Sequence, residues 1–190
     1  MLIKTKQKDA IFPMPVLLIA TFNDDNTVNV MNAAWGMMVH SDTIALNLDF
    51  DRKTLANIKN KGAFTVSLAT SSYVKEADYF GIVSGNKVNN KLAKTCLTFT
   101  KSELVNAPVI NELPVCMQCE YLEFQDGDNG CGVIGKVIET LVDDKYIKNG
   151  KIDVSDMHVL AFDPLGLKYY EIGKNVGKAF SCGLEIKNMK

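Results

Sequence analysis

Short runs of alternating apolar and polar residues recur along the chain, and this alternation is typical of half-buried β-strands. Residues 15–21 (PVLLIAT) form an apolar run of strand length, which the polar turn Asn-Asp-Asp-Asn at 23–26 ends. A second run extends from Thr27 to Trp35. Because only a polar turn separates the two runs, we expect them to form a β-hairpin.

Alternation assigns the residues of the second run to two faces of a strand. One face carries Val28, Val30 and Asn32, and the other carries Asn29, Met31, Ala33 and Trp35. We expect Gly36 to break this strand. Apolar residues at 44, 46 and 48 predict a third strand, which ends at Asp49.

The segment from Asp51 to Lys61 is predicted to form a short helix. Asp51 is suited to be its N-cap, Leu55 and Ile58 fall on its inner face, and Gly62 supplies a C-terminal stop. Alternation over residues 64–68 then predicts a fourth strand.

The second half of the chain is predicted to contain further helices, strands and turns. Two short helical segments are expected at 71–80 and 86–95, and residues 97–114 read as a linker. Long strands at 114–124 and 131–142 flank the turn sequence QDGDNG, which predicts a hairpin. Segments 159–162 and 168–172 are expected to form a last strand or a strand pair.

The sequence therefore predicts seven to nine strands and only three short helices. Turns, rather than helical crossovers, connect most neighbouring strands. This pattern predicts one domain over residues 1–190, with a mainly β (α+β) fold: an antiparallel barrel with short helices packed outside.

Composition narrows the classes of function. The net charge is −1, so no global field attracts nucleic acid or an anionic membrane. The apolar run at 11–20 is interrupted by Pro13 and Pro15, and no cleavage site for a signal peptide follows. No apolar run approaches the ~20 residues of a membrane span. We expect a cytoplasmic protein with reduced thiols.

Two residue types occur once each: Trp35 is the only Trp, and Arg52 is the only Arg among 21 basic residues. A planar aromatic and a planar cation suit a ligand with a flat ring and an anionic tail. A core Trp and a surface Arg are also common without any ligand, and composition alone favours that simpler interpretation.

The predicted helix start carries a charge conflict. Arg52 and Lys53 lie where the helix dipole is positive, which costs about 0.3–1 kcal/mol each. A bound phosphate would remove the conflict, because backbone N–H groups, both cations and the Thr54 hydroxyl all favour an anion. Alternatively, Asp49 and Asp51 neutralise the cations. From this segment the two interpretations are equally supported.

Ser84 and Gly85, followed by Lys87 and Lys91, form a second candidate anion contact. A solvated lysine face is the favoured interpretation of this pattern by itself.

Cys116 and Cys119 have the spacing of a redox or zinc pair, but residues three apart in a strand point to opposite faces. We interpret them as buried structural thiols and expect no metal. No catalytic triad, phosphate-binding loop or dinucleotide fingerprint is found, so we name no catalytic residue. If the protein is an enzyme, a cofactor is expected to carry the chemistry.

Seven segments between Pro13 and Gly183 carry a family resemblance. They are PMPVLLIAT, NVMNAAWGMMV, IALNLDFDRKTLANIKNKGAFTVSL, EADYFGIVSG with the following Lys91, APVINELPVCMQCEYLE, VIGKVIE and YYEIGKNVGKAFSCG. In these the chain resembles the flavin reductase-like, or flavoredoxin, family of FMN-binding split-barrel proteins. Asn90 and Cys96 depart from the family pattern, in which an acidic residue and a glycine are frequent there.

The resemblance implies an antiparallel split β-barrel of Greek-key type that binds FMN non-covalently. It implies that the isoalloxazine ring is lined by Asn32, Ala33, Ala34 and Trp35, and that Asn47, Leu48 and Asp49 continue this wall. It assigns the phosphate to Arg52, Lys53 and Thr54, with Ser84, Gly85 and Lys91 closing the site. It also implies a homodimer with the flavin near the subunit interface.

Three functions follow as expectations. In the first, FMN accepts a hydride from NADH or NADPH and passes electrons to free flavin or a partner protein. In the second, the chain is a flavoredoxin-type electron carrier that a partner protein reduces, without NAD(P)H activity of its own. In the third, the flavin site is lost and the barrel serves as an interaction protein.

Overall fold

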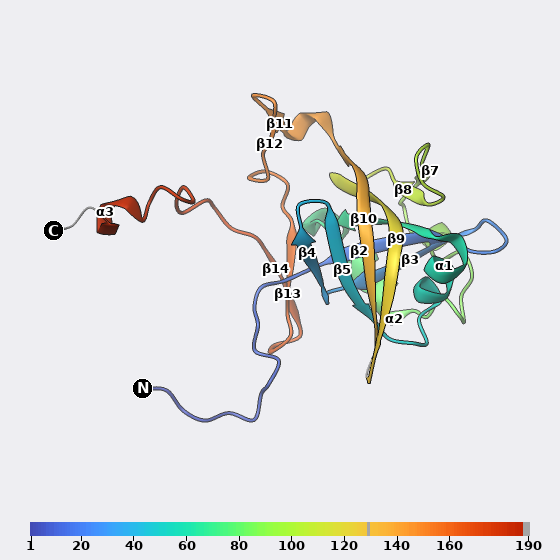
Figure 1. The fold of residues 1–190 in the computed structure, drawn as a ribbon, viewed down its shortest axis with the longest axis horizontal. Helices are drawn as coiled ribbons and strands as arrows, with labels where there is room; N and C mark the ends of the chain where they lie inside the picture. Colours follow the sequence, from blue (N-terminus) through green and yellow to red (C-terminus); the bar gives the residue numbers. More distant parts are fainter. Residues whose placement is uncertain (129, 188–190) are drawn as a thin grey trace.

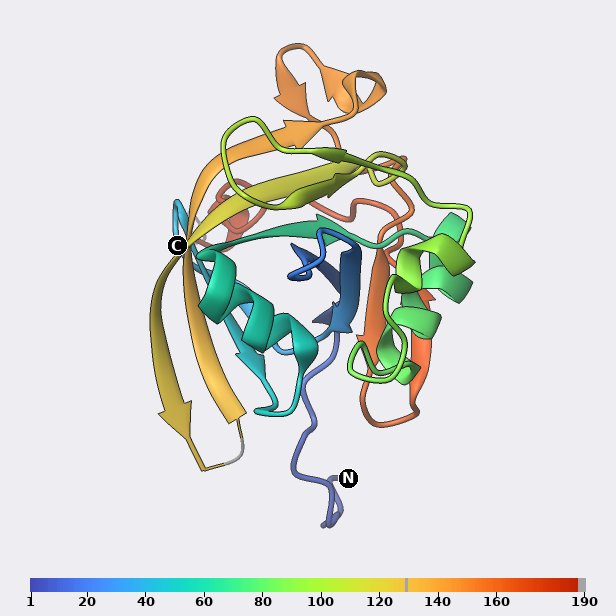
Figure 2. The same cartoon turned by 90° about the vertical axis from the view of Figure 1, so that its right-hand side faces the viewer.

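Seven antiparallel strands form the main sheet of the structure, a computed structural model that describes residues 1–128 and 130–187. Their order across the sheet is β3-β2-β6-β9-β10-β5-β4. The strands are β2 (Leu17–Phe22), β3 (Val28–Ala33), β4 (Gly36–His40), β5 (Thr43–Leu48), β6 (Ala63–Leu68), β9 (Val115–Gly127) and β10 (Gly130–Val142). The sheet curls into a half-barrel whose two edges are β3 and β4, which confirms the split-barrel prediction (Figures 1 and 2).

Both predicted hairpins are present. Strands β2 and β3 pair from Leu17 opposite Ala33 to Phe22 opposite Val28. Strands β9 and β10 pair along their length, with two register irregularities, and form the long two-stranded ribbon of Figure 1. The chain connections thus follow the turn signals in the sequence.

Strand β4 was not predicted. The expected break at Gly36 is wrong in position, because β3 ends at Ala33 and residues 34–35 separate it from a new strand that starts at Gly36 and pairs with β5. A β-carbon on Gly36 would lie 2.6 Å from Leu46 Cδ2 and 2.8 Å from Leu17 Cδ1, so only glycine permits this close approach. Trp35 therefore lies in the connection between β3 and β4, not at the end of a longer strand.

Helix α1 spans Lys53–Lys61, and its N-cap is Arg52 rather than Asp51, so that prediction is wrong. The backbone N–H of Arg52 instead closes a turn onto the Asp49 carbonyl at 3.2 Å, which keeps Asp51 out of the helix. Gly62 ends the helix in the left-handed conformation, with φ of 69°, as predicted.

The region from 71 to 114 differs more from expectation. The first helical segment is η1 (Ser71–Tyr73) followed by α2 (Val74–Ile82), whereas the second shrinks to the 3₁₀ turn η2 (Lys91–Lys94). Asn90 precedes this turn with φ of 47°, which interrupts any longer helix. The expected linker contains a small antiparallel pair, β7 (Phe99–Lys101) and β8 (Pro108–Ile110).

A separate three-stranded sheet has the order β1-β13-β14 and confirms the expected C-terminal strand pair. Its strands are β1 (Met14–Pro15), β13 (Leu160–Asp163) and β14 (Lys168–Glu171). The remaining elements are η3 (Asp144–Tyr146), β11 (Ile147–Lys148), β12 (Lys151–Ile152) and α3 (Leu184–Lys187). The segment before β1 and the segment from β14 to α3 lead away from the barrel (Figure 1).

Strand β2 is buried on both faces, which explains its continuous apolar run. Leu18 and Ala20 join the cluster that includes Phe80 of α2, and Leu17 and Ile19 join the cluster that includes Leu55 of α1. Figure 2 shows the two helices on either side of this strand. None of the helices in the described residues is long and apolar enough to cross a membrane.

Candidate functional site

Two neighbouring cavities are lined by the thirteen residues that the resemblance assigns to a flavin. The basic cavity, of about 170 Å³, is lined by Arg52, Lys53, Thr54, Ser84, Gly85 and Lys91, among others. The Trp35 cavity, of about 140 Å³, is lined by residues 32–35 and 47–49. Both cavities are also lined by Met31, Arg52 and Gly81, so they adjoin.

Lys91 is the most unusual residue of the basic cavity, because its side chain is only 2% exposed. Its Nζ donates hydrogen bonds to the carbonyls of Phe80 at 3.2 Å and Val83 at 2.9 Å, near the end of α2. An ammonium has three N–H donors, so one remains for a ligand. Burial and the neighbouring Arg52 lower the pKa of Lys91 to about 8. The interpretation as a solvated lysine is therefore wrong for Lys91, although Lys87 is exposed.

One of the two interpretations of the helix start, neutralisation of the cations by Asp49 and Asp51, holds for Arg52. Arg52 is neutralised by Asp49, whose Oδ2 accepts from Nε at 2.9 Å and also from Nη2. Lys53 and Lys91 have no carboxylate within 4.0 Å in the part of the chain that the structure describes. Two uncompensated ammonium groups thus line one cavity, which makes it suited to an anion.

Asn29 lines the basic cavity and was not among the predicted site residues. Its Nδ2 donates to Oγ1 of buried Thr54 at 2.8 Å. This bond uses the Thr54 oxygen as an acceptor and leaves its O–H free to donate. Asn29 is a polar residue on the strand face that it shares with Met31 and Trp35, and that pattern was the available signal.

Gly85 lets the loop after α2 approach α1. A β-carbon there would lie 2.3 Å from Asn29 Oδ1 and 3.1 Å from Lys53 Cβ. The loop is tied down by Asn86, whose Nδ2 donates to the Asp51 carbonyl at 2.7 Å. The absence of a side chain at residue 85 thus brings Ser84 and Lys53 to the same cavity.

The Trp35 cavity has a polar support on one side. Asn32 Nδ2 donates to the Ala77 carbonyl at 3.0 Å and to Tyr169 Oη at 3.3 Å, while Tyr169 Oη donates to Asp78 Oδ1 at 3.1 Å. Burial, with the Asp78 hydrogen bond, raises the pKa of Tyr169. The Asn32 amide N–H groups are therefore committed to α2 and β14, and its role is to hold the 33–35 segment in place.

Trp35 itself is 53% exposed, and its carbonyl accepts a 2.8 Å hydrogen bond from the backbone N–H of Asn47. The connection between β3 and β4 is thereby fastened to β5. This contact brings the two predicted wall segments, 32–35 and 47–49, side by side.

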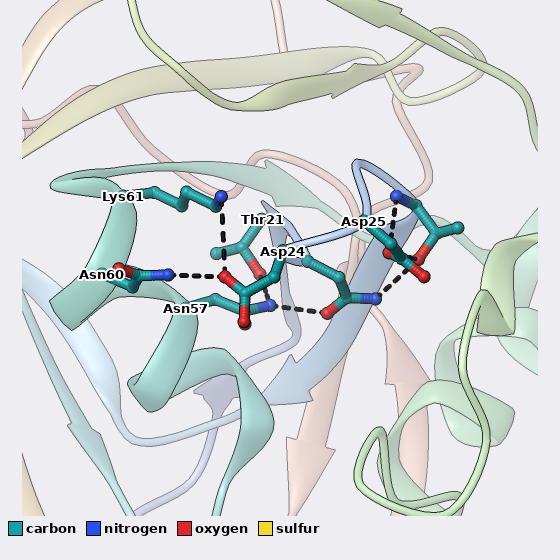
Figure 3. Close-up of polar contacts among 8 residues, drawn as sticks. Thr21, Asp24, Asp25, Asn57, Asn60 and Lys61 are labelled. Atoms are coloured by element: carbon teal, nitrogen blue, oxygen red, sulfur yellow. Dashed lines mark hydrogen bonds and ion pairs between the residues drawn. The ribbon is translucent and has the colours of Figure 1, made fainter.

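Polar contacts behind the site fix the direction of α1 (Figure 3). Asn57 Nδ2 donates to Thr21 Oγ1 at 3.0 Å and to Asn23 Oδ1 at 2.8 Å, within the protein interior. Nearer the helix end, Asp24 accepts from Asn60 at 2.5 Å and lies 3.6 Å from Lys61. These contacts hold the C-terminal half of α1 against the β2–β3 turn, so its N-terminus stays at the basic cavity.

Comparison with known proteins decides the family. Residues 9–162 match the family model described as the flavin reductase like domain. The chain belongs to the flavin reductase-like family. The structure superposes on the flavoredoxin of Desulfovibrio vulgaris (Miyazaki F) with a TM-score of 0.91 and 31% identity, covering 96% of this chain and 100% of that one.

Two further proteins are similar to this chain. The flavoredoxin of Methanosarcina acetivorans has a TM-score of 0.87 at 26% identity, covering 97% of this chain and 100% of that one. A protein of Archaeoglobus fulgidus is 29% identical over 135 residues, which are 70% of this chain and 75% of that protein.

The two departures from the flavin reductase-like pattern are Asn90 and Cys96. Asn90 adopts a left-handed backbone that asparagine tolerates well, immediately before the buried Lys91. Cys96 is exposed, with its Sγ 3.5 Å from Glu76 Oε1. Neither residue lines the two cavities.

Cys116 and Cys119 are buried unpaired thiols, as predicted. Burial raises the pKa of the Cys119 thiol to about 12 and also raises that of Cys116. A thiol with a raised pKa is a poor nucleophile and a poor metal ligand, so these residues act in packing.

Proposed function

We propose that this chain binds FMN non-covalently, with the phosphate in the basic cavity and the isoalloxazine ring at the Trp35 cavity. The observation that carries this proposal is Lys91, a buried ammonium with no carboxylate partner among the described residues. Burying an unpaired charge is costly, and proteins normally compensate it with a counter-ion. A phosphate dianion supplies that counter-ion.

Different groups of the chain would bind the phosphate and the ring of FMN. Lys91 and Lys53 offer charge, the Thr54 hydroxyl offers a hydrogen bond, and the first N–H groups of α1 offer a helix N-terminus. Arg52 lines both cavities and reaches the same region while paired with Asp49. The exposed Trp35 ring and the backbone of 47–49 offer a wall for a planar ring.

As a member of an oxidoreductase family, the protein would act in electron transfer through this flavin. We propose that it accepts a hydride from NADH or NADPH and passes electrons to free flavin or a partner. Bound FMN would supply the two-electron chemistry, and the walls of the two cavities would orient its ring. This division of labour requires no catalytic acid or base from the chain.

A second candidate is an electron carrier that a partner protein reduces. The 31% identity to a flavoredoxin over nearly the whole chain favours this function, as does the exposure of Trp35 at the ring end of the site. Rapid mixing of the FMN-loaded protein with NADH or NADPH separates the two. Bleaching of the oxidised flavin band at a useful rate supports the reductase, and no bleaching supports the carrier.

We also propose a homodimer in which the ring end of the site lies near the partner. Trp35 and the neighbouring edge strand β4 expose apolar side chains, among them Met37 and Val39. Apolar edge strands are favourable surfaces for self-association. Light scattering coupled to size-exclusion chromatography measures the mass, and a monomer at micromolar concentration would contradict the dimer.

The test of FMN binding is the visible spectrum and thermal stability of the purified protein with added FMN. A bound ligand at a hundred times its Kd stabilises the native state by about 2.7 kcal/mol. A colourless protein whose melting temperature does not change with FMN would overturn the proposal and would instead favour a barrel that has lost its flavin site.

A further inference from the structure

Lys91 follows a loop that the β2–β3 turn holds by side-chain hydrogen bonds. The loop runs from the end of α2 to η2, over residues 83–90. Asn89 of this loop is exposed, yet its amide makes three hydrogen bonds to the turn. Its Oδ1 accepts from Asn23 Nδ2 at 2.9 Å and from Thr27 Oγ1 at 3.1 Å, while its Nδ2 donates to Asp25 Oδ2 at 2.6 Å. We call Asn89 and these three turn residues the turn latch.

Asn23 anchors the turn latch in the protein interior, because this residue is only 4% exposed. Its Oδ1 accepts from Asn57 Nδ2 of α1 at 2.8 Å, and its Nδ2 also donates to Thr27 Oγ1 at 2.9 Å. A buried amide keeps such partners because an unpaired buried donor or acceptor is costly. The latch therefore joins the loop before Lys91 to the same turn that holds α1.

A single residue, Asn90, separates the turn latch from Lys91, and its backbone is left-handed, with φ of 47°. It turns the chain between Asn89, which is bound to the β2–β3 turn, and Lys91, whose Nζ is bound to carbonyls at the end of α2. After Lys91, the side chain of Leu92 packs in the core cluster that includes Phe80 of α2. Lys91 is thus held along the chain from both sides.

We propose that the turn latch positions Lys91 for the anion of the proposed site, so that Asn89 and Asp25 affect ligand binding without touching the ligand. This inference rests on the proposed FMN site. Neither Asn89 nor Asp25 lines the basic cavity or the Trp35 cavity. A lysine that is already ordered before a ligand arrives loses less conformational freedom on binding, which strengthens its bond to a phosphate. The latch pre-organises Lys91 in this way.

The variant Asn89→Ala removes the latch bonds of residue 89 and keeps every side chain of the basic cavity. We expect FMN affinity to fall roughly three- to tenfold, with riboflavin almost unchanged, since the phosphate is the group that Lys91 would bind. In the Lys91→Met background the same substitution should cause no further loss, because residues that act through one another are not additive. A loss that adds fully to that of Lys91→Met would overturn the proposal.

Asn111→Ala is the matched control for Asn89→Ala. Asn111 is also an exposed asparagine with side-chain hydrogen bonds, since its Nδ2 donates to Thr98 Oγ1 at 2.9 Å and its Oδ1 accepts from Thr100 Oγ1 at 3.1 Å. It lines neither the basic cavity nor the Trp35 cavity. FMN affinity should be unchanged in this control, and losses of equal size in the two variants would overturn the proposal.

The position of Lys91 is also measurable in the FMN-free protein. Burial and Arg52 lower the pKa of Lys91 to about 8, and both causes weaken when the residue moves toward solvent. Trace acylation with acetic anhydride between pH 7 and 10, read by mass spectrometry and normalised to exposed Lys75, follows the loss of the Lys91 proton. In the native protein the Lys91 rate should level off above about pH 9, whereas in Asn89→Ala it should still rise at pH 10. An unchanged profile would overturn the proposal.

The other charged groups around Lys91 are the same in the native protein and in Asn89→Ala. Among the described residues, α2 and β3 contribute no charged side chain to the basic cavity. The charged groups that line it besides Lys91 come from α1, from the residues before it and from the loop: Asp51, Arg52, Lys53 and Lys87. A shifted acylation profile therefore reports a change in the position of Lys91.

A charge-conserving exchange covers the case in which Asn89→Ala does not fold. Asn89→Asp alone sets a second carboxylate against Asp25 and should reproduce the effects of Asn89→Ala. With Asp25→Asn added, the new amide at residue 25 donates to the new carboxylate at residue 89 and still accepts from the backbone N–H and the hydroxyl of Thr27. We expect the double variant to regain the FMN affinity and acylation profile of the native protein. A double variant as impaired as Asn89→Asp would overturn the proposal.

The two kinds of measurement separate this inference from the proposed function. FMN binding by the native protein, with unchanged FMN affinity and acylation profile in Asn89→Ala, refutes the latch and leaves the FMN site standing. A native protein that does not bind FMN refutes the proposed function and with it the ligand of Lys91. A shifted acylation profile would in that case still support the positioning of Lys91 by the latch.

Discussion

The side chain of Asn29 on β3 donates a 2.8 Å hydrogen bond to Thr54 in the first turn of α1, and both residues are buried. This bond joins the edge strand of the barrel to the helix start. It orients the Thr54 hydroxyl so that its hydrogen is available to a ligand in the basic cavity. The strand and the helix therefore build the proposed phosphate site jointly.

The variant Thr54→Val tests that hydroxyl while keeping the shape of the side chain. A hydrogen bond to a charged group contributes about 1.5–3 kcal/mol, so FMN affinity should fall roughly 10- to 100-fold. Isothermal titration with FMN and with riboflavin measures the effect, and riboflavin should bind almost unchanged. Thr65→Val is a matched control, because buried Thr65 donates to the Pro108 carbonyl away from the cavities. A loss of FMN affinity in the control equal to that in Thr54→Val would refute the assignment.

The double variant Arg52→Ala with Lys53→Ala removes two cations from the wall of the basic cavity. We expect it to weaken FMN much more than riboflavin, which lacks the phosphate. Lys59→Ala is a control on the same helix, since Lys59 lies toward the far end of α1 and does not line the cavity. Equal losses for the two flavins would argue against a phosphate at the helix start.

Lys91→Met should lower FMN affinity at least roughly tenfold, because a charge-assisted bond to the phosphate is lost. In the native protein this affinity should also decline with pH above about 8, where the Lys91 amine of the FMN-free state loses its proton. Binding titrations between pH 7 and 9.5 measure the decline. An identical pH profile in Lys91→Met would show that another group is responsible.

The lowered pKa of Lys91 also leads to a prediction of how the stability of the FMN-free protein varies with pH. Its pKa falls from 10.5 to about 8 on folding, so between these values the unfolded chain binds more protons than the folded one. The free energy of unfolding should therefore rise with pH in this window, relative to Lys91→Met. Urea unfolding of both proteins at pH 7.5 and 9 measures the difference, in which the thiols and tyrosines cancel. A free energy of unfolding of the native protein that falls relative to that of Lys91→Met between pH 7.5 and pH 9 would contradict the burial of a charged Lys91.

Gly85→Ala should close the approach of the loop to α1. The new methyl group would meet Asn29 Oδ1 at 2.3 Å, and relief of that clash would displace the loop or break the Asn29–Thr54 bond. We expect a loss of about 1–3 kcal/mol in stability and weaker FMN binding. Gly173→Ala is the control, because a β-carbon there meets nothing within 4 Å. Unchanged melting temperature and FMN affinity in Gly85→Ala would refute the proposed role of this glycine.

Much of the barrel was predictable because its signals are local. Alternation within single strands, the turn residues at 23–26 and Gly62 as a helix stop each depend on a few neighbouring residues. Strand β4 escaped prediction because it is an edge strand with consecutive exposed apolar residues, so no alternation marks it. The start of α1 was misplaced because the Arg52 N–H bonds to the Asp49 carbonyl, a choice that propensity does not encode.

The sequence by itself determined the strand pattern, the lone Trp35 and Arg52, and the cation-rich helix start, since each is a property of residue order. Only the tertiary structure decided that Lys91 is buried with no carboxylate partner in the described part of the chain, and that Asn29 supports Thr54. It also joined Asn89 to the β2–β3 turn, two residues before Lys91. The physical reason is that burial and counter-ion pairing depend on residues distant in the chain, which no local pattern brings together.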